Sequence, residues 1–183
     1  MSGLGVDAGE LRERLEVLAL RETSPGVWSW EPVRRTWGKV TVDGKSNLFS
    51  SVGIGARNAV LVARKQELSL RYGMRWRGQH LFLTQITELD RTHLSLSAAL
   101  VALADCEMDG ISFPGVLTEK YNKWSQPEPY SVSQITYVLV TPPEIRLQRG
   151  GLVAVNGRNY EVQVAHTLDP NKIEYEIFRT EDL

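Results

Sequence analysis

The sequence has few of the residues from which disulfides, metal centres and most catalytic sites are built. Its 183 residues include one cysteine, Cys106, and three histidines, His80, His93 and His166, at unrelated spacings. A single cysteine forms no internal disulfide and is typical of a reducing compartment, and no cysteine–histidine set of the zinc-binding kind is present. Cys106 also lies in an acidic stretch, which raises the pKa of a thiol and weakens it as a nucleophile. We therefore expect no metal site and no enzyme.

Long apolar runs and a strong net charge are also missing. No apolar stretch approaches the roughly 18 residues that a membrane-spanning helix needs. The formal net charge is −1, so the chain has no overall basic field that would attract nucleic acid. The first residues do not show a basic segment followed by an apolar run, and we expect no signal peptide. These absences together predict a cytosolic, membrane-free chain.

Two short segments imitate ligand sites, and each departs from the pattern that it imitates. Residues 53–58 begin like a dinucleotide-binding fingerprint but end in Asn58, and they open a predicted strand rather than a helix. Residues 105–110 imitate the first half of a calcium loop, but the twelfth position is Val116 instead of a glutamate. We expect neither a cofactor nor a bound cation.

What the sequence does contain is an internal repeat. The first copy holds Val60-Leu61-Val62, Gly73, Gly78 and Leu89-Asp90, and the second holds Val138-Leu139-Val140, Gly151, Gly157 and Leu168-Asp169. The offset is 78 residues at first and 79 from the second glycine onward. Each copy is typical of four short strands separated by two glycine turns and an aspartate turn. Such a meander has unpaired edges, which we expect other copies of the chain to complete.

The pattern as a whole predicts a mainly β protein of two small antiparallel β-barrel or meander units, with a short N-terminal helical turn. The turn is expected over residues 9–14, followed by a strand over 15–22 and a long strand over 27–42. The first unit spans residues 1–103, residues 104–134 are a proline-containing linker or insertion, and residues 135–183 form the second unit. No counterpart of the opening hairpin is evident there, so the second unit is predicted to be a partial or diverged copy.

Residues 43–58 combine glycine and serine with apolar side chains. The residues that define this mixture are Leu48, Phe49, Val52, Gly53, Ile54 and Gly55. A loop of this length and composition is typical of a segment that contacts something, although a passive excursion remains the alternative.

Basic residues gather in the first copy of the repeat, where Tyr72 and Trp76 are interleaved with them. The basic residues are Arg57, Arg64, Lys65, Arg71, Arg75, Arg77 and Arg91. A strand face of aromatic and arginine side chains can bind nucleic acid, and a solvated face or a charged protein interface is the alternative. The five tryptophans are also suited to anchoring an interface. They are Trp28, Trp30, Trp37, Trp76 and Trp124.

Several segments in the first 103 residues or so resemble one protein family. These are residues 9–14 with the alternating strand after them, residues 36–40 around Trp37, residues 70–78 leading to 81–83 and Ile86, and the Leu89-Asp90 turn. In this order and spacing they are similar to the tailed-phage head-tail joining proteins, also called stopper, neck or head-closure proteins. Family members are about one such domain long, so residues 104–183 depart from the pattern.

The resemblance implies a small β-barrel subunit that forms a ring of six or twelve copies between the portal and adaptor proteins and the tail or tail terminator. The ring would close the head, and double-stranded DNA would pass through it without sequence-specific binding. The loop with Leu48, Phe49, Val52, Gly53, Ile54 and Gly55 would face the channel. Glu10, Arg12, Arg14 and the tryptophans would contact neighbouring copies or layers. The protein would lie in the virion neck after assembly in the host cytoplasm.

The repeat suggests that six chains would present twelve similar domains. Two other interpretations stay open. One is a nucleic-acid-binding β-barrel module that uses Arg71, Tyr72, Arg75, Trp76 and Arg77, and the other is a tail-terminator or collar component.

Overall fold

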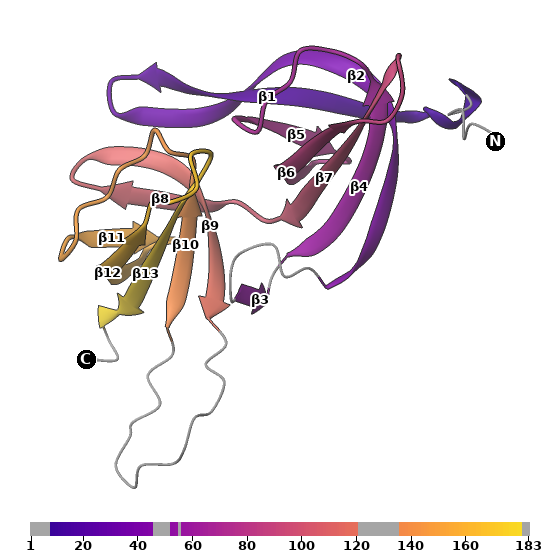
Figure 1. Cartoon of the computed structure of the whole chain (residues 1–183). Coiled ribbons are helices and arrows are strands. Elements are labelled where there is room, and N and C mark those ends of the chain that lie inside the picture. Colours follow the sequence, from indigo (N-terminus) through magenta and orange to yellow (C-terminus); the bar gives the residue numbers. More distant parts are fainter. Residues whose placement is uncertain (1–7, 46–51, 55, 121–135, 181–183) are drawn as a thin grey trace, which may run out of the picture. The chain divides into compact units, whose positions relative to one another are not determined.

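The computed structural model describes residues 8–45, 52–54, 56–120 and 136–180, and this part of the chain is almost entirely β-structure (Figure 1). Its only helical element is the three-residue 3-10 helix η1 (Ala8–Glu10), and no helix within these ranges could cross a membrane. The mainly β class predicted from the sequence is confirmed. The described residues divide into two compact units: those within 1–22, 29–48 and 56–102 belong to unit 1, and those within 23–28, 49–55 and 103–183 belong to unit 2.

Unit 1 is built on six strands. They are β1 (Glu13–Ser24), β2 (Val27–Lys45), β4 (Arg57–Arg64), β5 (Tyr72–Trp76), β6 (Gln79–Glu88) and β7 (His93–Val101). Hydrogen bonds connect them in the order β1-β5-β6-β7-β4-β2, and β1 also pairs with β2. The pairs from β1–β5 through β4–β2 are antiparallel.

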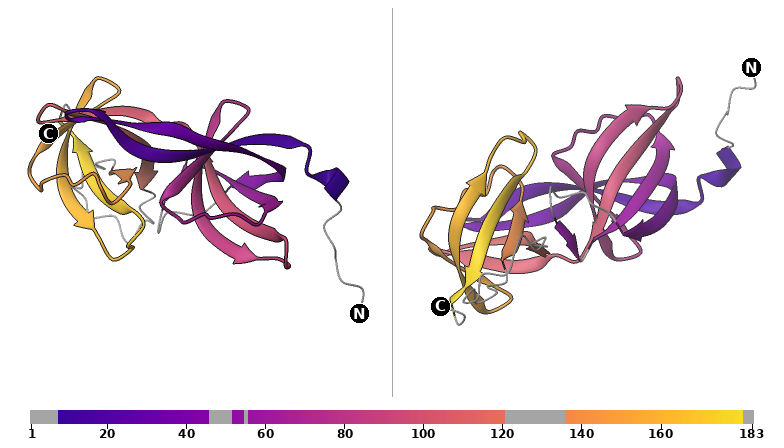
Figure 2. Two further views of the ribbon diagram at one scale, coloured as in Figure 1. Left: turned by 90° about the horizontal axis from the view of Figure 1, so that it is seen from above. Right: turned by 60° about the horizontal axis from the view of Figure 1, so that its bottom comes forward.

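Unit 2 is built on six longer strands and a short one. The strands after residue 136 are orange to yellow in Figure 2. The six longer strands are β8 (Ala104–Met108), β9 (Ile111–Lys120), β10 (Tyr137–Thr141), β11 (Leu152–Val155), β12 (Arg158–His166) and β13 (Ile173–Arg179). Their order is β9-β10-β13-β12-β11-β8, and β8 also pairs with β9. The short strand β3 (Val52–Ile54) pairs with β9. The start of β2 also pairs with β9, through one parallel bridge between Val27 and Ser112.

The two units share one topology. If the six strands of each unit are numbered in chain order, both units have the order 1-4-5-6-3-2 with a further pairing between 1 and 2. Strand 5 is bulged against strand 6 at the same place in each, between Leu83 and Gln85 and between Val162 and Val164. The repeat found in the sequence is therefore confirmed, and it includes all six strands.

The turns of the repeat also agree. Arg77-Gly78 and Asn156-Gly157 both have positive φ angles, which matches the two-residue hairpin turns that glycine favours. At the aspartate turns, the Asp90 Oδ1 atom accepts a hydrogen bond from the Thr92 amide at 2.7 Å, and Asp169 Oδ1 accepts one from the Asn171 amide at 2.8 Å. Aspartate stabilises both turns by bonding its own backbone.

The linker predicted over residues 104–134 is wrong in its described part, residues 104–120. These residues form β8 and β9, the counterpart of the β1–β2 hairpin, so unit 2 is a complete copy. Asp105 and Glu107 are exposed, while Cys106 between them is buried. The charged residues on the exposed side of β8 explain why the segment has the composition of a linker. Asp109 and Gly110, taken for part of a calcium-loop imitation, form the hairpin turn with φ angles of 51° and 80°.

Three other expectations differ from the structure. The helical turn over residues 9–14 is not found over that range, because β1 begins at Glu13 and η1 ends at Glu10. All thirteen described strands are connected in one hydrogen-bonded sheet rather than in two separate barrels. The unpaired edges expected of the meanders are also missing from the described strands, because β1 pairs with β2 and β8 pairs with β9.

Each unit has its own core on the inner side of its strands. The inner residues of unit 1 without exposed surface include Leu15, Leu61, Met74, Leu81 and Leu96. Those of unit 2 include Leu139, Val153, Val162 and Ile177. The phenol of Tyr175, 1% exposed, accepts a hydrogen bond from the Leu147 amide and donates one to the Ile145 carbonyl, each at 3.0 Å. Its polar end is therefore satisfied inside an apolar core.

Candidate interaction surfaces

The three histidines lie in separate environments. His93 contacts Asp90 through its Nδ1 atom at 2.9 Å, and His166 contacts Glu176 through Nε2 at 2.9 Å. His80 is buried against Trp30. Among the described residues, no three histidine, cysteine, aspartate or glutamate side chains come together where they could hold a metal ion.

His80 is the most unusual polar residue of unit 1. It is 6% exposed, its ring centroid lies 5.0 Å from that of Trp30, and its Nε2 atom has no hydrogen-bond partner among the described residues. Burial, with a smaller contribution from the charge of Arg75, lowers the pKa of His80 from 6.5 to about 4. The ring is therefore neutral in the folded unit at neutral pH.

Of the residues expected in a channel loop, Leu48, Phe49 and Gly55 lie outside the described residues. Val52, Gly53 and Ile54 form β3, which pairs antiparallel with the end of β9. The expected loop over residues 43–58 is thus shorter at both ends, since β2 continues to Lys45 and β4 begins at Arg57.

The charged residues of the opening segment are exposed and lie at the start of unit 1. The Glu10 carboxylate accepts a hydrogen bond from the Lys39 ammonium at 3.0 Å, and Arg12 donates from Nε to the Gly9 carbonyl. Arg14 is exposed on β1. The first of these contacts joins the opening segment to β2, and the second lies within the segment. Exposed ion pairs of this kind contribute little to stability, so these residues remain candidates for an interface.

The tryptophans differ sharply in exposure. Trp30 is 8% exposed and is a core residue of unit 1, which does not suit the predicted interface role. Trp28 is half-buried, as is Trp76, which donates a hydrogen bond from Nε1 to Glu13 at 2.9 Å. Trp37 is 58% exposed on β2, and Trp124 lies outside the described residues. Of the described tryptophans, Trp37 alone presents most of its surface to solvent.

Two arginines of the first repeat, Arg75 and Arg77, are paired with acids of β1. Arg75 contacts Glu16 at 3.1 Å, and Arg77 contacts Glu13 at 2.9 Å while its guanidinium lies 4.7 Å from the centre of the Trp76 ring. Hydrogen bonds from Trp76 and then from Arg77 lower the pKa of Glu13. The charges that a nucleic-acid site would direct at phosphates are partly neutralised here, which does not favour that interpretation.

No family model matches the sequence, and the comparison with curated proteins finds no match either. A solved structure that matches is a chain of the "Virion of native gene transfer agent (GTA) particle", 17% identical, with a TM-score of 0.42. The match covers 50% of this chain and 96% of that chain. We draw no conclusion about function from a likeness this distant.

Proposed function

We propose that this chain is a structural protein of a phage virion, a neck component that joins copies of itself into a ring between the portal and adaptor proteins and the tail. In this role it closes the DNA-filled head and offers the tail an attachment surface. The observation that carries the proposal is the resemblance to head-tail joining proteins, because its motifs fall in order on a single folded unit.

Those motifs occupy successive elements of unit 1. Residues 9–14 lie in η1 and the start of β1, Trp37 lies in β2, and Gly73 and Gly78 lie in β5 and the turn after it. Leu89 and Asp90 form the turn between β6 and β7, where the Leu89 and Asp90 amides both donate to the His93 carbonyl. In this chain the motifs are therefore neighbouring parts of one arrangement of strands, which supports the proposal.

We also propose that each unit acts as a small barrel-like subunit. The β1–β2 and β8–β9 pairings support this, because they give both end strands of each six-strand path a second partner. Strands without unpaired edges resist uncontrolled strand addition, which suits a protein that must assemble with defined neighbours. Assembly then depends on the faces of the units.

The experiment is removal of the coding sequence from a phage-producing strain, with purified protein added back to the extract. We expect heads that package DNA, lose it and carry no tails, and we expect the purified chain to restore infectious particles. Normal virions without the chain would refute the proposal. Mass spectrometry of intact virions adds an independent check, because a neck protein is present in them and a free nucleic-acid-binding module is not.

A further inference from the structure

One face of unit 1 is open to solvent, and we call it face A. It lies on the outer side of β2 and β4, where Lys39 is opposite Val62 and Thr41 is opposite Val60. Lys39 and Thr41 are exposed, the two valines are half-buried, and Trp37 on the same side of β2 is 58% exposed. Their neighbours Ala59, Leu61 and Ala63 point the other way and have no exposed surface. Face A thus combines three apolar side chains, Trp37, Val60 and Val62, with the exposed polar side chains of Lys39 and Thr41.

The equivalent face of unit 2 is buried. There Val116 is opposite Val140 and Thr118 is opposite Val138, the same strands and register as in face A. The exposed fractions of these four residues are 3%, 0%, 3% and 4% in that order. These four residues do not belong to the inner core of unit 2. The core side of the same strands is the one that carries Leu139 and Tyr175, which are opposite each other on β10 and β13. The same outer face is therefore buried in unit 2 and open in unit 1.

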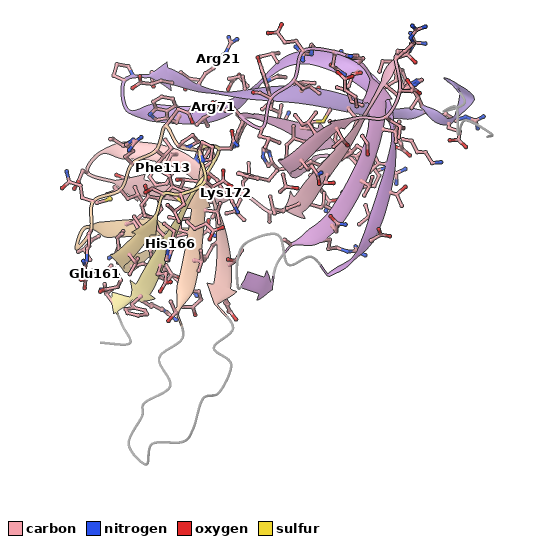
Figure 3. All side chains as sticks on the ribbon, in the orientation of Figure 1. Arg21, Arg71, Phe113, Glu161, His166 and Lys172 are labelled. Carbon is pink, nitrogen blue, oxygen red and sulfur yellow. The ribbon has the colours of Figure 1, made fainter. Side chains whose placement is uncertain are left out.

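A second outer face shows the reverse. In unit 2, Leu152 on β11 is opposite Glu161 on β12, which is opposite Phe178 on β13, and we call this face B (Figure 3, where Glu161 is labelled). Leu152 is 58% exposed, and the other two are half-buried. Face B is therefore open in unit 2.

In unit 1 the equivalent positions are buried. Gly73, Phe82 and Ala99 stand opposite one another in the same strand order, on β5, β6 and β7. Phe82 is 7% exposed, Ala99 is 0% exposed and Gly73 is buried. Each chain thus has one open copy and one covered copy of each face.

We propose that face A of one chain binds face B of a second copy of the same chain, head to tail. This inference rests on the proposed ring-forming function. The two faces differ from each other, as a heterologous contact requires, and repetition of such a contact produces a closed ring when its rotation permits. Their chemistry matches: Trp37 and the valines of face A meet Leu152 and Phe178. Lys39, which pairs with Glu10 of its own chain at 3.0 Å, adds a positive charge beside the carboxylate of Glu161. An exposed aromatic side chain among apolar residues is the usual anchor of such an interface.

The test is native mass spectrometry of the full-length chain and three variants over a range of concentrations. Trp37→Asp places a charge on face A, and Leu152→Asp places one on face B. Leu168→Asp is the matched control, because Leu168 is 101% exposed in a turn and lies on neither face. All three positions are exposed in the single chain, so circular dichroism is expected to show the wild-type fold for each.

We expect the wild-type chain and Leu168→Asp to form rings, and each face variant to stay monomeric. The loss of an anchor of this kind weakens association about 30-fold or more. The decisive sample is the mixture of Trp37→Asp with Leu152→Asp. Each of these chains keeps the face that the other lacks, so the mixture forms one-to-one dimers and nothing larger. Trp37→Phe keeps an apolar anchor and is expected to retain the ring.

Three results would overturn the inference. A ring that survives both face variants shows that other surfaces hold it together, and it leaves the proposed function intact. Loss of assembly with Trp37→Asp but not with Leu152→Asp shows a contact between identical faces. A wild-type chain that remains monomeric at every concentration removes both the contact and the ring on which it depends.

Discussion

His80 should make the stability of this protein fall as the pH drops from 7.5 to 5. The ring is 6% exposed, lies against Trp30 and leaves Nε2 without a partner among the described residues, so a positive charge there lacks both water and a hydrogen-bond acceptor. Arg75 opposes that charge as well. The unfolded chain, by contrast, exposes the imidazole and protonates it near its ordinary pKa.

The size of the effect follows from the two pKa values. The pKa of His80 is lowered from 6.5 to about 4 in the folded unit, so protons bind preferentially to the unfolded chain between these limits. The stabilisation is present in full above pH 6.5 and is lost as the pH falls towards 4. The free energy of unfolding at pH 5 should therefore be about 2 kcal/mol lower than at pH 7.5. The pKa values of Glu13 and Asp90 are also lowered in the folded chain, so these carboxylates stabilise it at neutral pH and lose that contribution in acid.

Urea unfolding at several pH values measures this loss, with His80→Phe as the test variant. Phenylalanine fills a similar volume against Trp30 and carries no titratable group, so we expect most of the pH dependence between 7.5 and 5 to disappear. His166→Gln is the control, because it removes a histidine whose side chain is 52% exposed and should keep the fall. Equal losses in the wild-type chain and His80→Phe would refute the reasoning. An NMR titration that places the pKa of His80 near 6.5 would refute it as well.

Three further predictions concern packing, reactivity and DNA. In Gly38→Ala, the new Cβ atom would lie 2.8 Å from the Val62 carbonyl oxygen, so urea unfolding should show a free energy of unfolding about 1–3 kcal/mol lower. Gly115→Ala is the comparison: its new Cβ atom would also lie 2.8 Å from a neighbour, but that neighbour is the movable tip of Leu139. The Gly115 variant should therefore lose less stability. The thiol of Cys106 is 3% exposed and burial raises its pKa to about 12, so a thiol reagent should modify it slowly in the native protein and rapidly in denaturant. The purified protein should retain little double-stranded DNA at physiological salt, whereas tight binding that weakens steeply with added salt would support the nucleic-acid alternative.

The sequence predicted those features that depend on short segments. The glycine turns at Gly78 and Gly157 and the aspartate turns at Asp90 and Asp169 are local, since their backbone conformations are favoured by the residues at the turn itself. The repeat of strands 3 to 6 could be found because the turns that connect them have nearly the same length in both copies. A single offset of 78 or 79 residues therefore aligns them.

The first two strands of unit 2 could not be found in the same way. The structure pairs Leu15 with Trp76 in unit 1 and Cys106 with Val155 in unit 2, which makes Leu15 and Cys106 equivalent at an offset of 91 residues. In the next strand, Thr41 and Thr118 are equivalent at an offset of 77. The hairpin β1–β2 is longer than β8–β9, so no constant offset relates the two hairpins. Which outer faces are covered also depends on contacts between distant segments, and no local pattern contains that information.

The comparison of equivalent positions shows what the duplication has kept and what it has changed. Inner positions keep their character, as Leu61 and Leu139 do, because both cores need close packing of similar volume. Two outer positions have exchanged their polarity, whereas Thr41 and Thr118 have kept theirs: Lys39 on β2 corresponds to Val116 on β9, and Phe82 on β6 corresponds to Glu161 on β12. Such an exchange gives no advantage to two units with the same surroundings. It is the expected result when an outer position is buried in one unit, and so needs an apolar side chain, while the equivalent position of the other unit is exposed to solvent. A chain that has diverged in this way has two different surfaces to offer its neighbours, which is the condition for directional assembly.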